Sequence, residues 1–187
     1  MPKYTLLIVF FGLSSCRHGQ PDQNTKTLDF GAFSIETPKS WTQIRERGTD
    51  SYVGRIAIDA KDTLEFDLGW YSNNLYEYDP TILDSDMISS IDTFRRNIRD
   101  IIFVKNSRHL DPDKYRRNNI SWDTIDGRKA KIVYPRESGI GMTGIYVDSL
   151  FISGSEVDRF NLYGNNLRPS NEREVLAALR TLKFHKR

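Results

Sequence analysis

The clearest strand in the chain is TLEFDLGWY, residues 63–71. Leu64, Phe66, Leu68 and Trp70 share one face of it, and Glu65 and Asp67 share the other. Because successive side chains of a strand point to opposite faces, this alternation predicts a strand with one buried face and one open face. The fold should therefore contain a sheet that covers a core on one side.

Shorter strands are expected on both sides of this stretch. Phe33 and Ile35 alternate with polar residues until Pro38, which ends the opening strand before Trp41. Asp126-Gly127 is a strong hairpin signal between two alternating runs, residues 122–125 and 129–134. Further strands are expected at residues 56–58, 145–151 and 160–162 and at Phe184.

Two helices are expected in addition. Asp79 suits a helix cap and Pro80 a first helical position, and an apolar stripe follows to an end near Arg99. The run 101–104 (IIFV) fits either the end of this helix or a strand. Asn171 has capping-box spacing to Glu174 at the start of a closing helix. The stripe residues are Leu83, Met87, Ile91, Phe94, Ile98 and Ile101 in the first helix, and Val175, Leu176, Leu179 and Leu182 in the second.

Together these elements predict an α+β domain, with a mostly antiparallel sheet and helices packed on it. Their order resembles the PsbP-like family between Leu28 and Phe184, and the chain is also similar to small lipoproteins of Bacteroidota. The resemblance implies an α/β/α sandwich and a function in binding rather than catalysis. The segments that carry it are FSIETPKSW (33–41), TLEFDLGWY (63–71), Ile125-Asp126-Gly127 and Leu182-Lys183-Phe184.

The N-terminal segment is typical of a bacterial lipoprotein. Lys3 precedes an apolar run of about ten residues, the length of a signal segment, whereas a spanning helix needs about twenty. Leu13-Ser14-Ser15-Cys16 then resembles a lipobox, in which Cys16 receives the lipid. We expect a signal peptide over 1–15, a disordered tether over 16–27 and a single domain over 28–187. Arg17 follows Cys16 at the position where an aspartate often retains lipoproteins in the inner membrane, and no acidic run that resembles a surface-export signal comes after it. We therefore expect an anchor in the outer membrane, with the domain facing the periplasm.

Composition narrows the function further. The net charge of +2 is spread over interspersed acidic and basic residues, which gives no reason to expect nucleic acid as a partner. Cys16 is the only cysteine, so the mature domain has no disulfide and no thiol nucleophile. We identify no catalytic residue. Gly139, Gly141 and Gly144 spell G-x-G-x-x-G, but a strand is expected after them where a dinucleotide site needs a helix, so we expect no cofactor. The expected partners are the membrane and a protein of the cell envelope.

The segment 70–78 is the main candidate for partner binding. Trp70, Tyr71, Tyr76 and Tyr78 lie there among asparagines, and amphipathic aromatic residues beside amides are typical of recognition surfaces. The alternative is a loop that folds over the edge of the core with its rings buried.

Two other sets of residues carry groups suited to chemistry. His109, Asp111 and Asp113 could supply one nitrogen and two carboxylates to a divalent ion if the chain turned at Pro112. Glu65 and Asp67 could perform acid–base chemistry on the open face of their strand. The favoured function is a non-catalytic binding or scaffold module. The alternative is a carboxylate-dependent hydrolase or a small-ligand binder acting on envelope material.

We expect Cys16→Ala to abolish the incorporation of labelled palmitate, because the acyl anchor requires the cysteine thiol. Immunoprecipitation of the labelled protein measures this directly. Persistent label in the variant would show that the lipobox interpretation is wrong.

Overall fold

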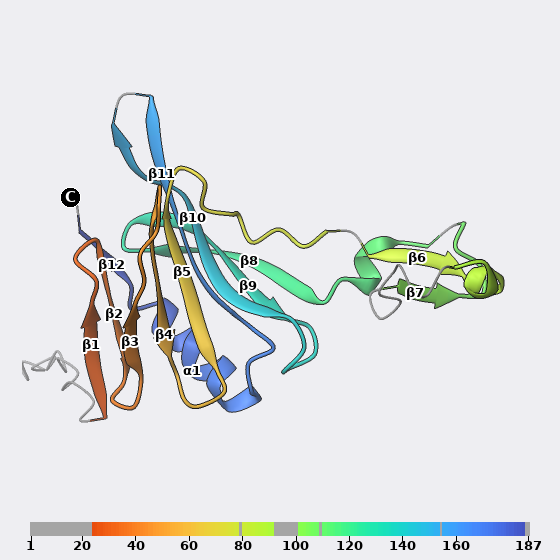
Figure 1. Cartoon of the computed structure of the whole chain (residues 1–187), viewed down its shortest axis with the longest axis horizontal. Helices are drawn as coiled ribbons and strands as arrows, with labels where there is room; N and C mark the ends of the chain where they lie inside the picture. Colours follow the sequence, from red (N-terminus) through yellow and green to blue (C-terminus); the bar gives the residue numbers. More distant parts are fainter. Residues whose placement is uncertain (1–23, 79, 92–100, 109, 154, 186–187) are drawn as a thin grey trace, which may run out of the picture.

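The computed structural model describes residues 24–78, 80–91, 101–108, 110–153 and 155–185. Its largest element is an antiparallel sheet with the strand order β3-β4-β5-β11-β10-β9-β8 (Figure 1). These seven strands are β3 (Thr42–Arg45), β4 (Tyr52–Ala57), β5 (Thr63–Gly69), β8 (Asn118–Ile125), β9 (Arg128–Pro135), β10 (Met142–Ser153) and β11 (Glu156–Asn165).

A smaller antiparallel sheet and one α-helix complete the body of the molecule. The small sheet has the order β1-β2-β12, and the helix contacts β2 of this sheet and β10 of the large sheet. The helix therefore joins the two sheets. The elements are β1 (Thr25–Asp29), β2 (Phe33–Pro38), β12 (Lys183–Phe184) and α1 (Pro169–Leu179).

Phe33 of β2 is the centre of an aromatic core between the sheets. Its fully buried ring stacks on Phe30 at 4.6 Å and meets Phe66 of β5 at 5.0 Å and Phe160 of β11 at 4.8 Å, between ring centres. Each such aromatic pair contributes about 1 kcal/mol beyond the burial of its area. The predicted opening strand and the inner face of residues 63–68 are thus confirmed, and they pack against each other.

The predicted Asp126-Gly127 hairpin is confirmed. Both residues have positive φ, 49° and 74°, as a type I′ turn between β8 and β9 requires. The Asp126 carboxylate also accepts a hydrogen bond from the backbone nitrogen of Phe184 at 2.9 Å. This turn therefore fixes β12, the expected strand at Phe184, which pairs with β2.

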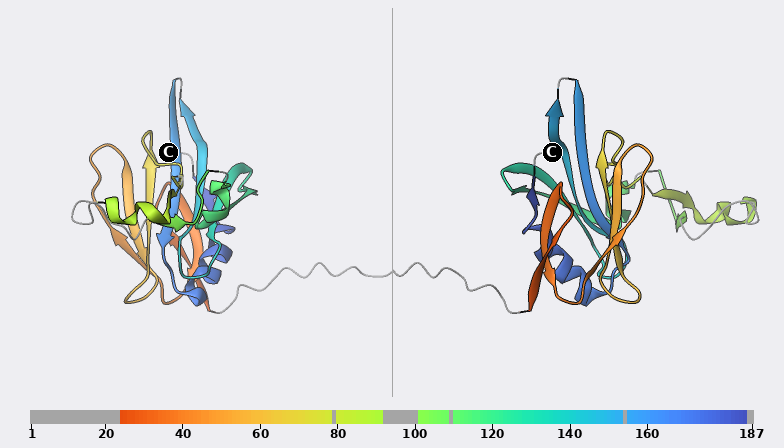
Figure 2. Two further views of the ribbon diagram at one scale, coloured as in Figure 1. Left: turned by 90° about the vertical axis from the view of Figure 1, so that its right-hand side faces the viewer. Right: turned by 60° about the vertical axis from the view of Figure 1, so that its left-hand side comes forward.

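The helix expected from Asp79 to Arg99 is wrong over its described part. Thr81–Asp84 forms strand β6, which pairs in parallel with β7 (Ile101–Val104), and Ser85–Ser90 forms a 3₁₀ helix. This β6–β7 unit stands apart from the sheets (Figures 1 and 2). Neither sheet therefore provides a face on which the apolar stripe could pack as a helix. Met87 remains 44% exposed. Residues 79 and 92–100, which include Phe94 and Ile98, lie outside the described residues.

The α+β class, with helices packed on the sheet as in an α/β/α sandwich, is consequently wrong. In the described part of the chain α1 is the only α-helix, and a second short 3₁₀ helix covers Pro112–Tyr115. The structure is a β-rich fold of mostly antiparallel sheets. Helical periodicity in the sequence is not sufficient to predict a helix, because most helices in proteins are stabilised by the tertiary packing of one face.

The capping box at Asn171 is also wrong, because α1 begins two residues earlier, at Pro169. The buried Asn171 amide instead donates to Asp59 at 2.6 Å and to Asp62 at 2.7 Å. The first turn of α1 is thereby joined to the turn between β4 and β5. This contact spans more than a hundred residues of sequence, which no local capping pattern can reveal.

The start of the domain differs slightly from expectation. The sequence predicts a tether that extends to Thr27, but Thr25, Lys26 and Thr27 belong to β1 and pair with residues 36–38 of β2. The signal peptide, Cys16 and residues 17–23 lie outside the described residues. No helix of the described residues has the length and apolar character needed to cross a membrane.

Asp126→Asn should lower the unfolding free energy of the domain at neutral pH. It should also reduce the further loss of unfolding free energy as the pH falls. The hydrogen bond from Phe184, and then the Lys183 and Arg128 charges, lower the pKa of Asp126 from its ordinary value of 3.8. A lowered folded-state pKa stabilises the fold above the unfolded value, and this stability is lost as the pH falls through the folded value. Asparagine keeps the turn because it tolerates positive φ.

Urea unfolding between about pH 5 and pH 2 measures this effect. The exposed α1 residue Glu174 supplies a control, Glu174→Gln, which should follow the wild type. An Asp126→Asn protein with the same acid dependence as the wild type would contradict the role given to this carboxylate.

Candidate functional site

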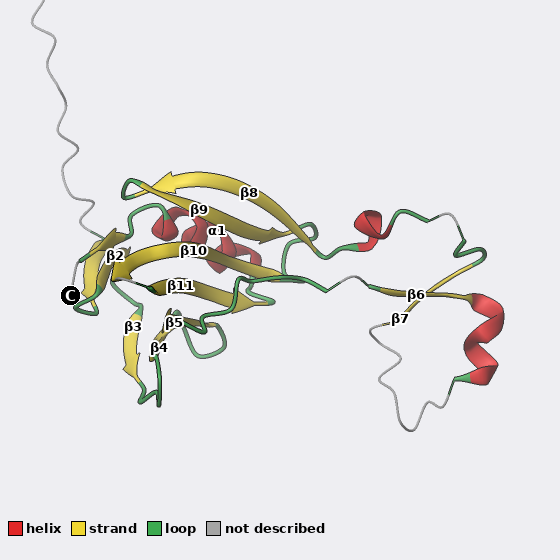
Figure 3. Cartoon of the chain, turned by 90° about the horizontal axis from the view of Figure 1, so that it is seen from above, coloured by secondary structure: helices red, strands yellow, loops and turns green. Residues whose placement is uncertain are grey.

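The segment Trp70–Tyr78, here called the strap, leaves the end of β5 and crosses the open face of the large sheet. In Figure 1 it runs from β5 toward the β6–β7 unit, and Figure 3 shows the same course from above. The Ser72 hydroxyl donates to the carbonyls of Asp67 on β5, at 2.9 Å, and Arg159 on β11, at 3.1 Å. The strap is thus attached to two strands at its start. The sequence pattern predicts a strand that continues to Tyr71, but β5 ends at Gly69.

Leu75 anchors the middle of the strap. It is 2% exposed and packs with Val133 of β9 and Tyr146 of β10 in a cluster separate from the main core. Leu75 has a φ of 51°, a left-handed conformation that costs a branched residue about 1 kcal/mol. The Asn73 carboxamide supports this shape by accepting a hydrogen bond from the Leu75 nitrogen at 3.0 Å. Burial of the leucine offsets the cost of its backbone conformation.

Lys131 of β9 lies beneath the strap and holds its backbone. The ammonium group donates to the Leu75 carbonyl at 3.3 Å and lies 5.7 Å from the centre of the Tyr146 ring. Burial lowers the pKa of Lys131. Since an ammonium group is costly to bury without partners, the contact with the Leu75 carbonyl favours the docked strap.

A chain of polar contacts holds the first residue of the strap. The Tyr146 hydroxyl donates to Asp148 at 2.6 Å, and Arg159 donates to the same oxygen at 3.3 Å. Arg159 also donates to the Trp70 carbonyl, and its guanidinium lies 5.9 Å from the centre of the indole ring. Burial, and then the hydrogen bond to Asp148, raise the pKa of Tyr146 to about 12, so its hydroxyl keeps the proton at neutral pH.

The aromatic rings of the strap point to solvent. Trp70 is 45%, Tyr71 76%, Tyr76 51% and Tyr78 85% exposed. The strap does fold over the sheet, as the alternative interpretation supposed, but its buried residues are Ser72 and Leu75 and not the aromatic residues. Four large aromatic residues are therefore displayed on a backbone that the sheet holds in place.

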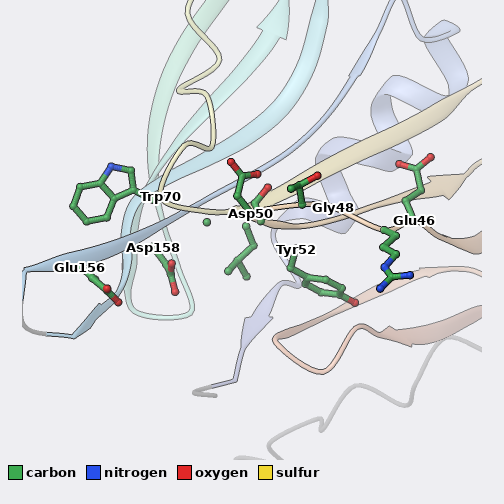
Figure 4. A pocket seen from close by; sticks show the side chains of 12 residues that line it. Glu46, Gly48, Asp50, Tyr52, Trp70, Glu156 and Asp158 are labelled. Atoms are coloured by element: carbon green, nitrogen blue, oxygen red, sulfur yellow. The ribbon is translucent and has the colours of Figure 1, made fainter.

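These four residues form two groups, Trp70 with Tyr71 and Tyr76 with Tyr78. Trp70 borders a cavity of about 640 Å³ at one end of the sheet, and Figure 4 shows it beside Glu156 and Asp158. Tyr76 and Tyr78 meet edge to face at 5.5 Å between ring centres and border a different groove, of about 540 Å³, at the other end of the strap.

The walls of the Tyr76–Tyr78 groove are well fixed. The Glu77 carboxylate accepts hydrogen bonds from the backbone nitrogens of Arg117, at 2.6 Å, and Asn118, at 3.0 Å. Asn118 in turn accepts from the Met142 nitrogen at 2.7 Å. The other residues lining the groove include Tyr115, Ile102, Asn165 and Asn166.

The anchoring residues were not identified from the sequence. Leu75 and Glu77 lie among the tyrosines of the strap, and Lys131 is one of two lysines in an alternating strand. Their roles arise from contacts across 40 to 56 positions of sequence. No local signal marks them.

The candidate metal ligands have other roles where they are described. Asp111 accepts a hydrogen bond from the Asp113 nitrogen at 3.1 Å and so caps the 3₁₀ helix at Pro112–Tyr115. The Asp113 carboxylate pairs with Arg116 at 2.8 Å. His109 lies outside the described residues, among which no cluster of three histidine, cysteine or acidic side chains could hold a metal ion.

Comparison with known proteins adds no family assignment, since no protein-family model and no curated protein matches the sequence. The resemblance to PsbP-like proteins stays a prediction.

Leu75→Ala should loosen the strap, because it removes the side chain that seats the strap on the sheet. We expect a loss of about 2 kcal/mol in unfolding free energy and faster amide exchange over residues 70–78, measured by hydrogen–deuterium exchange. Asn74→Ala, at the exposed neighbouring position, is the control and should behave as the wild type. Unchanged exchange in Leu75→Ala would show that another contact holds the strap.

Proposed function

We propose that this chain is a lipid-anchored protein of the bacterial cell envelope whose domain binds a protein partner through the strap, without catalysis. The observation that supports this function best is the exposure of Trp70, Tyr71, Tyr76 and Tyr78 on a backbone fixed by Leu75 and Lys131. Tyrosine and tryptophan dominate the binding energy of many interfaces. Fixing them before binding reduces the entropy lost on association.

The surroundings of Tyr76 and Tyr78 favour a protein as the partner. Asn118, Asn165 and Asn166 provide amide groups beside the two rings, and aromatic anchors combined with adaptable polar groups are typical of protein recognition. Two further exposed apolar residues, Ile120 and Trp122, follow Asn118 on the same face of β8. They extend the apolar surface away from the groove.

The anchor would limit which partners the domain can meet. We place the lipid on Cys16 and the domain on the periplasmic side of the outer membrane, on the strength of the lipobox and the residue that follows it. A domain tethered in this way encounters envelope proteins at a raised effective concentration. Modest affinity would then suffice for binding.

The double variant Tyr76→Ala and Tyr78→Ala should lose the partner. We expect chemical crosslinking in intact cells, followed by mass spectrometry, to recover at least one envelope protein with the wild type. Its yield should fall about tenfold or more in the double variant, because truncated aromatic anchors cost about 2 kcal/mol or more each.

Ile152→Ala provides the matched control, since Ile152 is 67% exposed near the tip of the β10–β11 hairpin and belongs to neither the strap nor its groove. This control should recover the partner at the wild-type yield. An unchanged set of crosslinked proteins in the double variant would remove the strap from the proposal.

A further inference from the structure

A second site lies on the open face of the large sheet, on strands β4, β5 and β11. The strand register places Arg55, Glu65 and Tyr163 in one row across these strands and Val53, Asp67 and Asn161 in the next row. Residues two apart in a strand share a face, so both rows lie on the same side, opposite the aromatic core. Five of these six side chains are polar.

The two rows line a cavity of about 470 Å³, which Asn73 of the strap and Glu46 also border. This volume falls in the range of small-molecule sites. The Tyr76–Tyr78 groove shares no lining residue with this cavity. The cavity is therefore separate from the proposed protein-binding surface, although the strap forms one of its walls.

Several polar groups of the cavity are held in place. Buried Asn161 accepts a hydrogen bond from the Asp67 nitrogen at 3.1 Å and donates to the Asn73 carbonyl at 2.9 Å. The Tyr163 hydroxyl donates to Glu65 at 3.3 Å. Burial and the Glu65 charge raise the pKa of Tyr163, so its hydroxyl keeps the proton.

Two polar atoms of the residues lining the cavity are covered from solvent without a hydrogen-bond partner among the described residues. They are the Oδ1 atom of Asp67, an acceptor, and the Nε atom of Arg55, a donor. Covered polar groups without partners are unfavourable. A small rotation of either side chain toward the cavity would expose these atoms to a ligand hydroxyl, which suits both kinds of group because it can donate one hydrogen bond and accept others.

The charge of the cavity restricts the ligand further. Glu46, Glu65 and Asp67 are acidic and Arg55 is the one basic residue among the residues lining it. An anionic ligand would face a net negative site, whereas a neutral ligand with many hydroxyl groups would match the mixed donors and acceptors. We propose that this cavity binds a neutral saccharide, with hydroxyl groups directed at Asp67, Glu65 and Arg55.

Calorimetric titration of the full chain tests this proposal. The probes are three neutral oligosaccharides, chitohexaose, cellohexaose and maltohexaose, and one anionic oligosaccharide, hexagalacturonate. We expect at least one neutral probe to bind and hexagalacturonate not to bind. Asp67→Asn and Glu65→Gln should each weaken binding about tenfold, the effect of losing one hydrogen bond to a charged group.

Two controls separate this site from its surroundings. Asp158→Asn removes a carboxylate outside the cavity and should bind as the wild type. The Tyr76→Ala and Tyr78→Ala double variant should also keep saccharide binding, so failure of the strap proposal and failure of this one are distinguishable. Tyr163→Phe, which keeps the ring and removes the hydroxyl, gives a third variant if one of the carboxylate variants does not fold.

Three results would overturn the proposal. The first is that no neutral probe binds at millimolar concentration, and the second is that only hexagalacturonate binds. The third is that a neutral probe binds but the Asp67, Glu65 and Tyr163 substitutions leave its affinity unchanged.

Discussion

The packing of Leu75 against Val133 and Tyr146 is the contact on which the outer face of this protein depends. It holds the strap across the sheet, and the strap in turn displays the exposed aromatic rings and closes one side of the polar cavity. The left-handed backbone at Leu75 makes the contact specific, because few other packing arrangements of this side chain would offset the energetic cost of that backbone conformation. Lys131 reinforces the contact from below by binding the Leu75 carbonyl.

The two faces of the large sheet differ in burial and in the residues that they carry. The inner face packs on Phe33, the small sheet and α1 and contains the main core. Antiparallel sheets often bury one face and expose the other. Because the inner face supplies most of the buried apolar area, the outer face can carry charged residues, asparagines and exposed rings. Trp122 illustrates this freedom, since it is 59% exposed with the Lys129 ammonium 4.5 Å from its ring centre.

Local signals in the sequence were sufficient for several strands of the large sheet, for β2 and for one turn. The alternation of Leu64, Phe66 and Leu68 and the Asp126-Gly127 pair each depend on neighbours in the chain, so they could be predicted correctly. The expected helix after Pro80 failed because an apolar stripe forms a helix mainly where a neighbouring face buries it, and the β6–β7 unit stands apart from the sheets. In the structure, Thr81–Asp84 pairs with Ile101–Val104 instead.

The candidate site was predictable in part. The aromatic composition of residues 70–78 marked the segment, but exposure of the rings follows from the seating of Leu75 on strands far along the chain. The cavity beside it could not be foreseen either. The alternation of Glu65 and Asp67 indicates a shared face, yet only the strand register brings Arg55, Asn161 and Tyr163 beside them.

The central claim is that the strap is a rigid platform for exposed aromatic side chains. Backbone ¹⁵N relaxation measured by NMR on the full chain tests it most directly. The account predicts order parameters of about 0.85 from Ser72 to Tyr76, equal to those of the sheet. Values below about 0.6 in this segment, with a rigid sheet beneath it, would contradict the account.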